Sequence, residues 1–455
     1  MANFITHSIT FPGKENYDKI LKPLFIGKSP FETQGVRIMP NVQSIMKLNY
    51  WGAVTKVLKA YAKGFSPATG STLTQRSISV YQMKAEIAQD ANAFYQTIYE
   101  QLLAKGVDWN DLSKAGGALQ QTIIDIFMNA LKSDVYRQFW LNDEDKETVT
   151  SVYYSGTDDA DYNAYDGMWK IIFDNAAESP SATQIQLFDY DASAVKQIAT
   201  VTMSGSSGTA NITINGVAYL ATYTSNLPTS NANFVTSHAA ALLLRGIVVT
   251  VSTNDLIFTS AVPGQPFAAP TIANVVANLA GTNAATLANA APSDLSGDQT
   301  LGILKTMYTD SHAVLKALPK NQKVYLMDGY SYENYLSTLE AKTSSAATFT
   351  SEMGRTMMID GVDYITYRGI PVINLGWETD LEADFPHASG EKPARVYRII
   401  YTALQNLVLS MDAMSEFSKF EFWFNKDEQE NRYRMQMKTG ANYVHNALMS
   451  VAYEA

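Results

Sequence analysis

The 455-residue chain has a formal net charge of −10, and 17% of its residues are charged while 46% are hydrophobic. This length is sufficient for two or three domains with a sizeable core. The chain contains no cysteine, which excludes disulfides, a thiol nucleophile and thiolate metal sites, and fits synthesis in a reducing cytoplasm. The charged fraction is below the usual quarter. It indicates either a surface covered by copies of the same chain or a surface rich in Ser, Thr and Asn.

The charge is unevenly spread. Residues 1–80 hold ten basic and three acidic side chains, so this segment carries 10 − 3 = +7 and the remainder −17. The asymmetry predicts either a basic arm that meets an acidic subunit surface or a nucleic acid, or simply a solvated basic face. The first residues lack the apolar stretch of a signal peptide, and no apolar run reaches the ~18 residues that span a bilayer.

The first 82 residues contain turn signals and alternating patterns. Residues 1–46 predict an extended arm with turns at its prolines and glycines. Residues 47–82 predict a long hairpin-like excursion, with limbs near KLNYW and LTQRSISVYQM and a tip of sequence KGFSPATGS.

Two helices are expected next. Ile87, Phe94, Ile98 and Leu102 recur at helical spacing and predict an amphipathic helix over residues 83–105. A second apolar stripe predicts a long helix over roughly 111–140, and AYDGMWKIIFDNAAE predicts a short one.

Residues 198–262 predict an inserted ββαββ module that is nearly free of charge. Asn215-Gly216 gives its first hairpin a type I′ turn signature. Its helix is expected to have Ser230 or Asn231 near the N-cap and to stop before Gly246. The strands IVVTV and LIFTS form the second hairpin. The module is either a protrusion that contacts neighbours or decorates an exterior, or a surface embellishment without a partner.

The remaining chain alternates between strands and helices. Residues 263–296 are rich in Ala and Asn and predict a linker-like return. A helix over GDQTLGILKTMYTDSHAVLKAL, a buried strand over KVYLMDG and a helix over YSYENYLSTLEAK follow, then a Ser/Thr-rich loop over 341–356. Tyr364–Arg368 is a strand that turns at Gly369. Phe420, Phe422 and Phe424 share one face of a strand that returns, after a polar turn, as a strand through Tyr433 and Met437.

Reactive chemistry is sparse. None of the five histidines lies four residues from another, and no zinc, nucleophile-elbow or phosphate-loop motif is present. Asp159, Asp161 and Asn163 match the start of a calcium loop, but Ala164 and Lys170 occupy positions that need Gly and Glu. A solvated acidic turn is favoured over a looser divalent site. We therefore predict no catalytic residue, no cofactor and no metal ligand, and no sequence-specific nucleic-acid motif.

The order of these elements, with RGIPVINL and the closing strands from Phe420 to Met437, resembles the HK97-fold major capsid proteins of tailed bacteriophages. The resemblance implies an α+β fold with an N-terminal arm, an extended loop, a peripheral domain with a spine helix, an apical domain and here an inserted ββαββ module. The corresponding boundaries are 1–46 for the arm, 47–82 for the loop, 83–197 for the peripheral domain, 198–262 for the module, 263–412 for the apical domain and 413–455 for strands that return to the peripheral domain.

The resemblance also implies a function. Hexamers and pentamers of the chain would close into an icosahedral shell around non-specifically bound double-stranded DNA, with portal, scaffold, decoration or auxiliary proteins as further partners and no membrane. Such a shell is a virion capsid, assembled in the bacterial cytoplasm. On the extended loop, Trp51, Phe65 and Arg76 are predicted to contact neighbouring subunits. The alternatives are an encapsulin-like nanocompartment and a tail, neck or adhesin-type phage protein; an enzyme is disfavoured.

Overall fold

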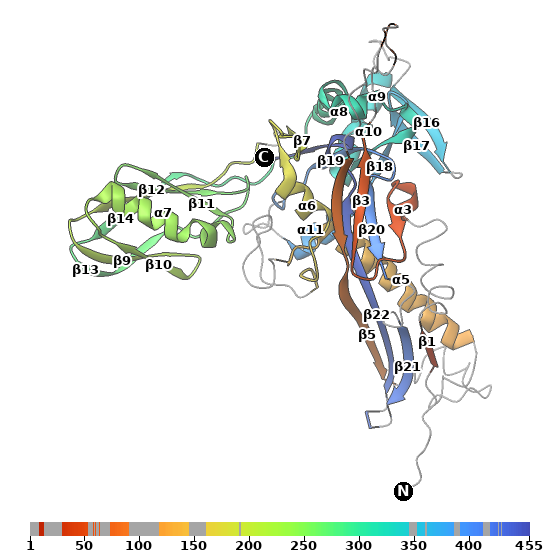
Figure 1. The fold of residues 1–455 in the computed structure, drawn as a ribbon, viewed down its shortest axis with the longest axis horizontal. Helices are drawn as coiled ribbons and strands as arrows, with labels where there is room; N and C mark the ends of the chain where they lie inside the picture. The colour runs from red at the N-terminus through yellow and green to blue at the C-terminus, as the bar shows by residue number, and fades with distance from the viewer. Residues whose placement is uncertain are drawn as a thin grey trace. The chain divides into compact units, whose positions relative to one another are not determined.

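The computed structural model describes residues 9–12, 30–52, 58, 60, 63, 73–90, 118–144, 161–190, 193–344, 353–359, 362–385, 392–412, 419–425, 427–428 and 430–455. Within these residues the chain forms two compact units (Figure 1). Unit 1 comprises residues 1–142, 164–171 and 404–445, and unit 2 comprises residues 143–163, 172–403 and 446–455. Both helices and strands are present, so the fold is α+β, as predicted.

Unit 1 is built on a six-stranded sheet. Its strands are β1 (Ile9–Pro12), β2 (Arg37–Met39), β5 (Tyr81–Asp90), β20 (Leu407–Met411), β21 (Lys419–Asn425) and β22 (Glu430–Tyr443). Their order is β1-β21-β22-β20-β2, and β5 pairs with the other edge of β22. The predicted hairpin of the C-terminal region is confirmed, because β21 and β22 pair antiparallel and bury Phe420 and Phe422.

The predicted long helix is also confirmed. Helix α5 (Ala118–Leu141) lies on the sheet of unit 1, where the Phe127 ring is 5.6 Å from that of Phe420 and 6.4 Å from that of Tyr433. Helix α3 (Pro30–Thr33) is a short helix of unit 1. The residues of another short helix, α6 (Met168–Asn175), are divided between the two units.

The predicted helix over 83–105 is wrong in the part that the structure describes. Residues 81–90 are strand β5, which pairs antiparallel with β22 from Tyr81↔Thr439 to Asp90↔Glu430. Residues 91–105 lie outside the described residues. Pairing with a strand about 350 positions later overrides the local helical spacing.

The predicted hairpin before β5 is present. Strands β3 (Ile45–Trp51) and β4 (Leu73–Ser79) pair antiparallel from Ile45↔Ser79 to Trp51↔Leu73. We call these two strands the ribbon. Its tip lies mostly outside the described residues.

Unit 2 contains an eight-stranded mixed sheet. In spatial order its strands are β16 (Met353–Ile359), β17 (Val362–Tyr367), β18 (Ile370–Asn374), β15 (Lys323–Met327), β19 (Arg398–Ala403), β23 (Met449–Tyr453), β7 (Ile185–Asp189) and β6 (Ala176–Ala177). The predicted turn between β17 and β18 is confirmed, with Arg368 and Gly369 both at positive φ. The last strand, β23, lies between β19 and β7 and not beside β21 and β22.

Helices accompany this sheet. They are α8 (Gln299–Asp310), α9 (Ala313–Ala317), α10 (Gly329–Ser344), α11 (Glu378–Asp384) and the 3-10 turns η5 (Lys320–Gln322) and η6 (Asn446–Leu448). The single helix predicted over 297–318 is two helices, because the chain extends at Ser311 and His312 caps α9 through its side chain. Strand β15 is buried at every position, as predicted.

Residues 198–287, which we call the module, form two further sheets and one helix within unit 2. The strands are β8 (Ile198–Ser204), β9 (Gly208–Ile214), β10 (Val217–Thr222), β11 (Ile247–Ser252), β12 (Asp255–Ser260), β13 (Thr271–Ala277) and β14 (Ala280–Leu287). One sheet has the order β10-β9-β13 and the other β11-β12-β8-β14. Helix α7 (Leu227–Leu243) lies along them (Figure 1).

The structure corrects the sequence-based description of this region in two places. Residues 263–296 are not all linker, since β13 pairs with β9 and β14 pairs with β8. Helix α7 begins four residues earlier than expected: its N-cap is Asn226, whose side chain accepts from the Thr229 amide, and Pro228 lies in its first turn. The predicted type I′ turn is confirmed, with Asn215 and Gly216 both at positive φ.

Candidate assembly surfaces

The buried residues of the ribbon lie on one face, and the other face is exposed. On the buried face Leu48 and Ile78 pack in a cluster with Met39, Val42 and Val408 of the same unit. On the other face Trp51 is 67% exposed. A two-stranded ribbon is marginally stable in water by itself, so the buried cluster is what fixes its direction.

Contacts with β22 and the residues after it add to this anchoring. The Arg76 guanidinium lies 3.7 Å from the centroid of the Tyr443 ring, and the Asn442 amide donates to the Ser77 carbonyl oxygen at 2.8 Å. The Tyr50 and His445 rings are 4.2 Å apart. Burial raises the pKa of the Tyr443 hydroxyl, and the nearby Arg76 opposes this shift.

The three predicted contact residues therefore have different surroundings. Trp51 is at the exposed end of β3, opposite Leu73, which is 43% exposed. Arg76 is half-buried and held within its own unit by Tyr443 and Asn442. Phe65 lies outside the described residues. The structure does not bring Trp51 and Arg76 together: they are on opposite strands, three register positions apart.

Sequence reasoning missed Ile45 and Met46, which are 67% and 41% exposed at the start of β3. Their apolar character was visible in the sequence, but their exposure depends on the register that pairs Ile45 with Ser79. With Trp51 and Leu73 they give the ribbon large apolar side chains in solvent. Exposed apolar groups of this kind are typical of surfaces that bind another protein.

The module carries a second set of exposed apolar side chains and almost no charge. Its charged residues are Arg245 and Asp255. The larger exposed apolar residues are Leu220, Leu243, Leu244, Val248, Val251, Val275, Val276 and Leu287. The module nevertheless has its own buried core, which includes Phe234, Leu256 and Phe258.

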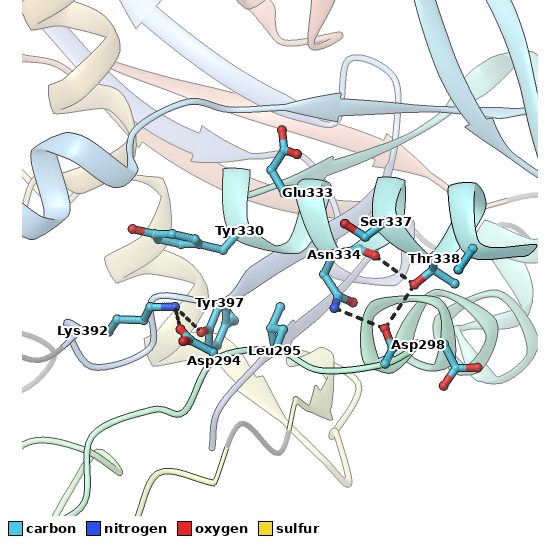
Figure 2. Close-up of a pocket in the computed structure, with 12 residues that line it drawn as sticks. Asp294, Leu295, Asp298, Tyr330, Glu333, Asn334, Ser337, Thr338, Lys392 and Tyr397 are labelled. Carbon is cyan, nitrogen blue, oxygen red and sulfur yellow. Dashed lines mark hydrogen bonds and ion pairs between the residues drawn. The ribbon is translucent and has the colours of Figure 1, made fainter.

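A cavity of about 710 Å³ lies in unit 2 between α10, residues 294–298 and the segment that carries Lys392 and Tyr397. Three carboxylates line it, from Asp294, Asp298 and Glu333, together with Lys392 and the rings of Tyr330 and Tyr397 (Figure 2). Lys392 Nζ bonds to Asp294 and, at 2.9 Å, to the Tyr397 hydroxyl.

These contacts determine the charge of the cavity. Burial lowers the pKa of Lys392, but the bonds to Asp294 and Tyr397 outweigh burial and the net pKa is raised. Burial, reinforced by the hydrogen bond to Glu382, raises the pKa of Tyr330 to about 12. The carboxylates, Lys392 and the tyrosine hydroxyls make this a polar lining that can bind polar or cationic groups.

The buried polar centre of unit 2 is structural. Asp328 is fully buried at the start of α10 and accepts hydrogen bonds from the Ser331 amide and hydroxyl and from the Arg398 amide. Burial raises its pKa to about 6 despite these bonds. The Arg398 guanidinium is also buried and lies 5.0 Å from the Phe173 ring.

The possible divalent site near residue 160 lies partly outside the described residues. Asp159 lies outside the described residues, and Asp161 is exposed. Among the residues that the structure describes, no three His, Asp or Glu side chains are grouped so as to hold a metal ion. Within the same residues no helix is long and apolar enough to cross a membrane.

No family model and no curated protein matches this chain. Solved structures do match it over most of its length. The satellite phage P4 procapsid including the size determination (Sid) protein matches with a TM-score of 0.43 and 9% identity, over 94% of this chain and 87% of that one. The capsid of an empty GTA particle matches with a TM-score of 0.39 and 8% identity, over 94% and 90%.

The holo-SrpI encapsulin complex of Synechococcus elongatus PCC 7942 matches with a TM-score of 0.36 and 9% identity, over 94% and 88%. The first two structures are of capsids and the third is of an encapsulin. Because all three TM-scores are below 0.5, the matches are likenesses from which no role is drawn.

Proposed function

We propose that the chain is the repeating subunit of a closed protein shell, the major capsid protein of a tailed bacteriophage. In this role its copies form hexamers and pentamers that close into an icosahedral shell around double-stranded DNA. The protein then resides in the virion, after assembly in the cytoplasm of the bacterial host.

The observation that carries the proposal is the ribbon. One face is fixed by Leu48, Ile78 and the Arg76–Tyr443 contact, whereas Ile45, Trp51 and Leu73 on the other face are exposed. An apolar surface on a well-anchored projection is suited to a partner and costs free energy without one. A second copy of the same chain is the simplest partner, because the low charged fraction of 17% is typical of interface-forming surfaces.

The proposed role is mechanical and involves no catalysis. Asp328 and Tyr325, whose pKa values burial raises, lie fully buried in unit 2. Desolvation in a packed core causes these pKa shifts. Structural burial and active sites both perturb pKa values, so the shifts do not mark an active site.

Other partners follow from the same proposal. DNA contacts would be non-specific and made by basic side chains, since no base-reading motif occurs in the chain. A portal and scaffold, decoration or auxiliary proteins would complete the particle. The module, with its exposed apolar side chains and two charged residues, is the candidate surface for decoration proteins or neighbouring subunits.

The test compares assembly of the wild type with that of Trp51→Ala. Removing an exposed Trp that becomes buried at a contact costs about 3 kcal/mol per subunit. The protein concentration needed for assembly then rises by roughly 10²-fold. Thr306→Ala, at an exposed position of α8, is the matched control and assembles as the wild type does.

Arg76→Ala gives a different result if Arg76 anchors the ribbon within its own subunit. It reduces the protection of β3 and β4 from hydrogen exchange before assembly, whereas Trp51→Ala does not. Normal particles from Trp51→Ala at the wild-type concentration would contradict the proposed role of the ribbon. A small ring or trimer in place of a shell would favour a tail or adhesin-type protein, and shells filled with protein cargo would favour an encapsulin-like compartment.

A further inference from the structure

Strand β5 forms an edge of the unit 1 sheet among the described residues. It spans ten residues, Tyr81–Asp90, and pairs with β22 along one side. No other strand among the described residues pairs with it. Figure 1 shows β5 running alongside β22. A strand edge of this length presents unpaired N–H and C=O groups that can pair with another chain.

The apolar face of the sheet continues onto β5 without being covered there. Met83, Ala85 and Ile87 lie opposite Met437, Met435 and Tyr433 of β22. Residues opposite one another in an antiparallel pair share a face, and these three partners are buried. Ile87 nevertheless remains 42% exposed and Tyr81 43% exposed. A further strand paired with β5 would therefore extend the buried apolar face of the unit 1 sheet.

The sequence of β5 is complementary to itself in one antiparallel register. If Ala85 of one copy lies opposite Ala85 of another, Lys84 lies opposite Glu86 and Met83 lies opposite Ile87. Lys84 and Glu86 already form an ion pair 2.8 Å long within one strand, and their side chains are 68% and 49% exposed. The register therefore places opposite charges together on one face and apolar side chains together on the other.

We infer that β5 pairs antiparallel with β5 of a second copy about a two-fold axis at Ala85, which joins the two unit 1 sheets into one. The contact deepens the proposed function and rests on it. Ten residues are fewer than the 20–30 per side of a stable isolated interface, so the pairing forms as one contact within a larger assembly. In this pairing two subunits of the shell are related by two-fold symmetry and meet through the residues of β5.

The absence of cysteine from the chain makes the register measurable by disulfide crosslinking. Opposite residues in an antiparallel pair have Cα atoms about 4.5 or 5.5 Å apart, which is within the range of about 4.4–6.8 Å that a disulfide spans. Residues offset by two positions are about 8 Å apart and cannot be bridged without distortion.

The experiment uses single-cysteine variants of the full chain, assembled and then oxidised. Ala85→Cys crosslinks to itself. Lys84→Cys alone and Glu86→Cys alone give little product, whereas a mixture of the two, combined before assembly, gives the crosslinked dimer. Thr306→Cys, at an exposed position of α8, is a control that stays uncrosslinked.

Electron microscopy of the same samples separates this inference from the proposed function. Shells in which neither Ala85→Cys nor the mixture crosslinks would overturn the β5 contact and leave the shell proposal standing. Equal crosslinking of Lys84→Cys alone, Glu86→Cys alone and their mixture would overturn the register. Crosslinked dimers without shells would support the contact and count against the shell.

Discussion

The carbonyl oxygen of Ser79 occupies the place where a side chain on Gly440 would begin. A Cβ on Gly440 would lie 2.0 Å from that oxygen, at the point where the ribbon joins the sheet of unit 1. Ser79 is the last residue of β4, and Gly440 is in β22. The close approach of these two backbones requires glycine, so the position of the ribbon depends on it.

We expect Gly440→Ala to destabilise the protein by about 1–3 kcal/mol, because backbone atoms cannot move aside without shifting a strand. The free energy of unfolding from denaturant titration measures this loss. The matched control is Gly302→Ala in α8, where an added Cβ meets nothing within 4 Å. Ala favours helix over Gly by up to about 1 kcal/mol, so the control is neutral or stabilising. An equal effect of both changes would contradict the assigned role of Gly440.

The buried carboxyl of Asp328 predicts a pH dependence of stability. Burial raises its folded-state pKa to about 6, from the 3.8 of a free aspartate carboxyl. The folded state therefore binds more protons than the unfolded state between these values. The contribution of Asp328 to stability is greatest below pH 4, falls by up to about 3 kcal/mol as the pH rises through 6, and is constant above about pH 7.

Comparison with Asp328→Asn isolates this contribution from that of other groups. The variant cannot titrate, so the free energy of unfolding of the wild type minus that of the variant should decrease between pH 4 and 7. The variant also turns a donor toward the Arg398 amide, which is 2.8 Å from the carboxylate, and an unsatisfied buried donor costs about 1–3 kcal/mol. A difference that does not change with pH would show that Asp328 is not the group responsible.

The last strand of the chain should be essential for unit 2. Strand β23 is buried at all five positions and lies between β19 and β7. A chain that ends at Leu448 loses both ladders, and we expect hydrogen exchange in β19 and β7 to rise most. Removing Ala455 alone deletes one contact, from its amide to Asp189, and should leave exchange nearly unchanged. Retained protection of β19 in the longer truncation would contradict this.

The module should be removable without unfolding the rest of unit 2. Val195 and Ala290 pair with each other where the chain enters and leaves it, through two backbone hydrogen bonds of 3.0 and 3.2 Å. The module also has a buried cluster separate from that of the eight-stranded sheet. Replacing residues 197–288 by an Asn-Gly turn keeps the paired ends together.

Circular dichroism, proteolysis and hydrogen exchange of the excised variant measure the outcome. Exchange in β15 and β19 should match that of the full chain. An insoluble variant, or one in which β15 exchanges freely, would show that the module contributes to the fold of the remainder.

Local signals in the sequence predict many of these elements. Asn215-Gly216, the alternation of Phe420 and Phe422, and the apolar stripe of α5 each reflect interactions within a few residues. The sequence predicts a helix where β5 forms, because Ile87 fits helical spacing with Phe94. The alternation of Tyr81, Met83 and Ile87 fits a strand equally well, and pairing with β22 decides between the two.

The sequence does not predict strands β13 and β14, for another reason. Six of the seven residues of β13 are exposed, so its sequence carries little apolar pattern. Backbone pairing with β9 holds it in place, and Asn278 reinforces this by accepting hydrogen bonds from the Ser206 and Ser207 amides. Trp51 is exposed and its contact role stays a prediction, whereas the internal contacts of Arg76 with Tyr443 and Asn442 depend on the three-dimensional register.

The most direct test of the shell proposal is electron microscopy of the purified protein, with and without a crowding agent. The account predicts closed shells, or sheets of hexamers and pentamers. A protein that remains monomeric, or forms only small rings or trimers, under all these conditions would contradict it.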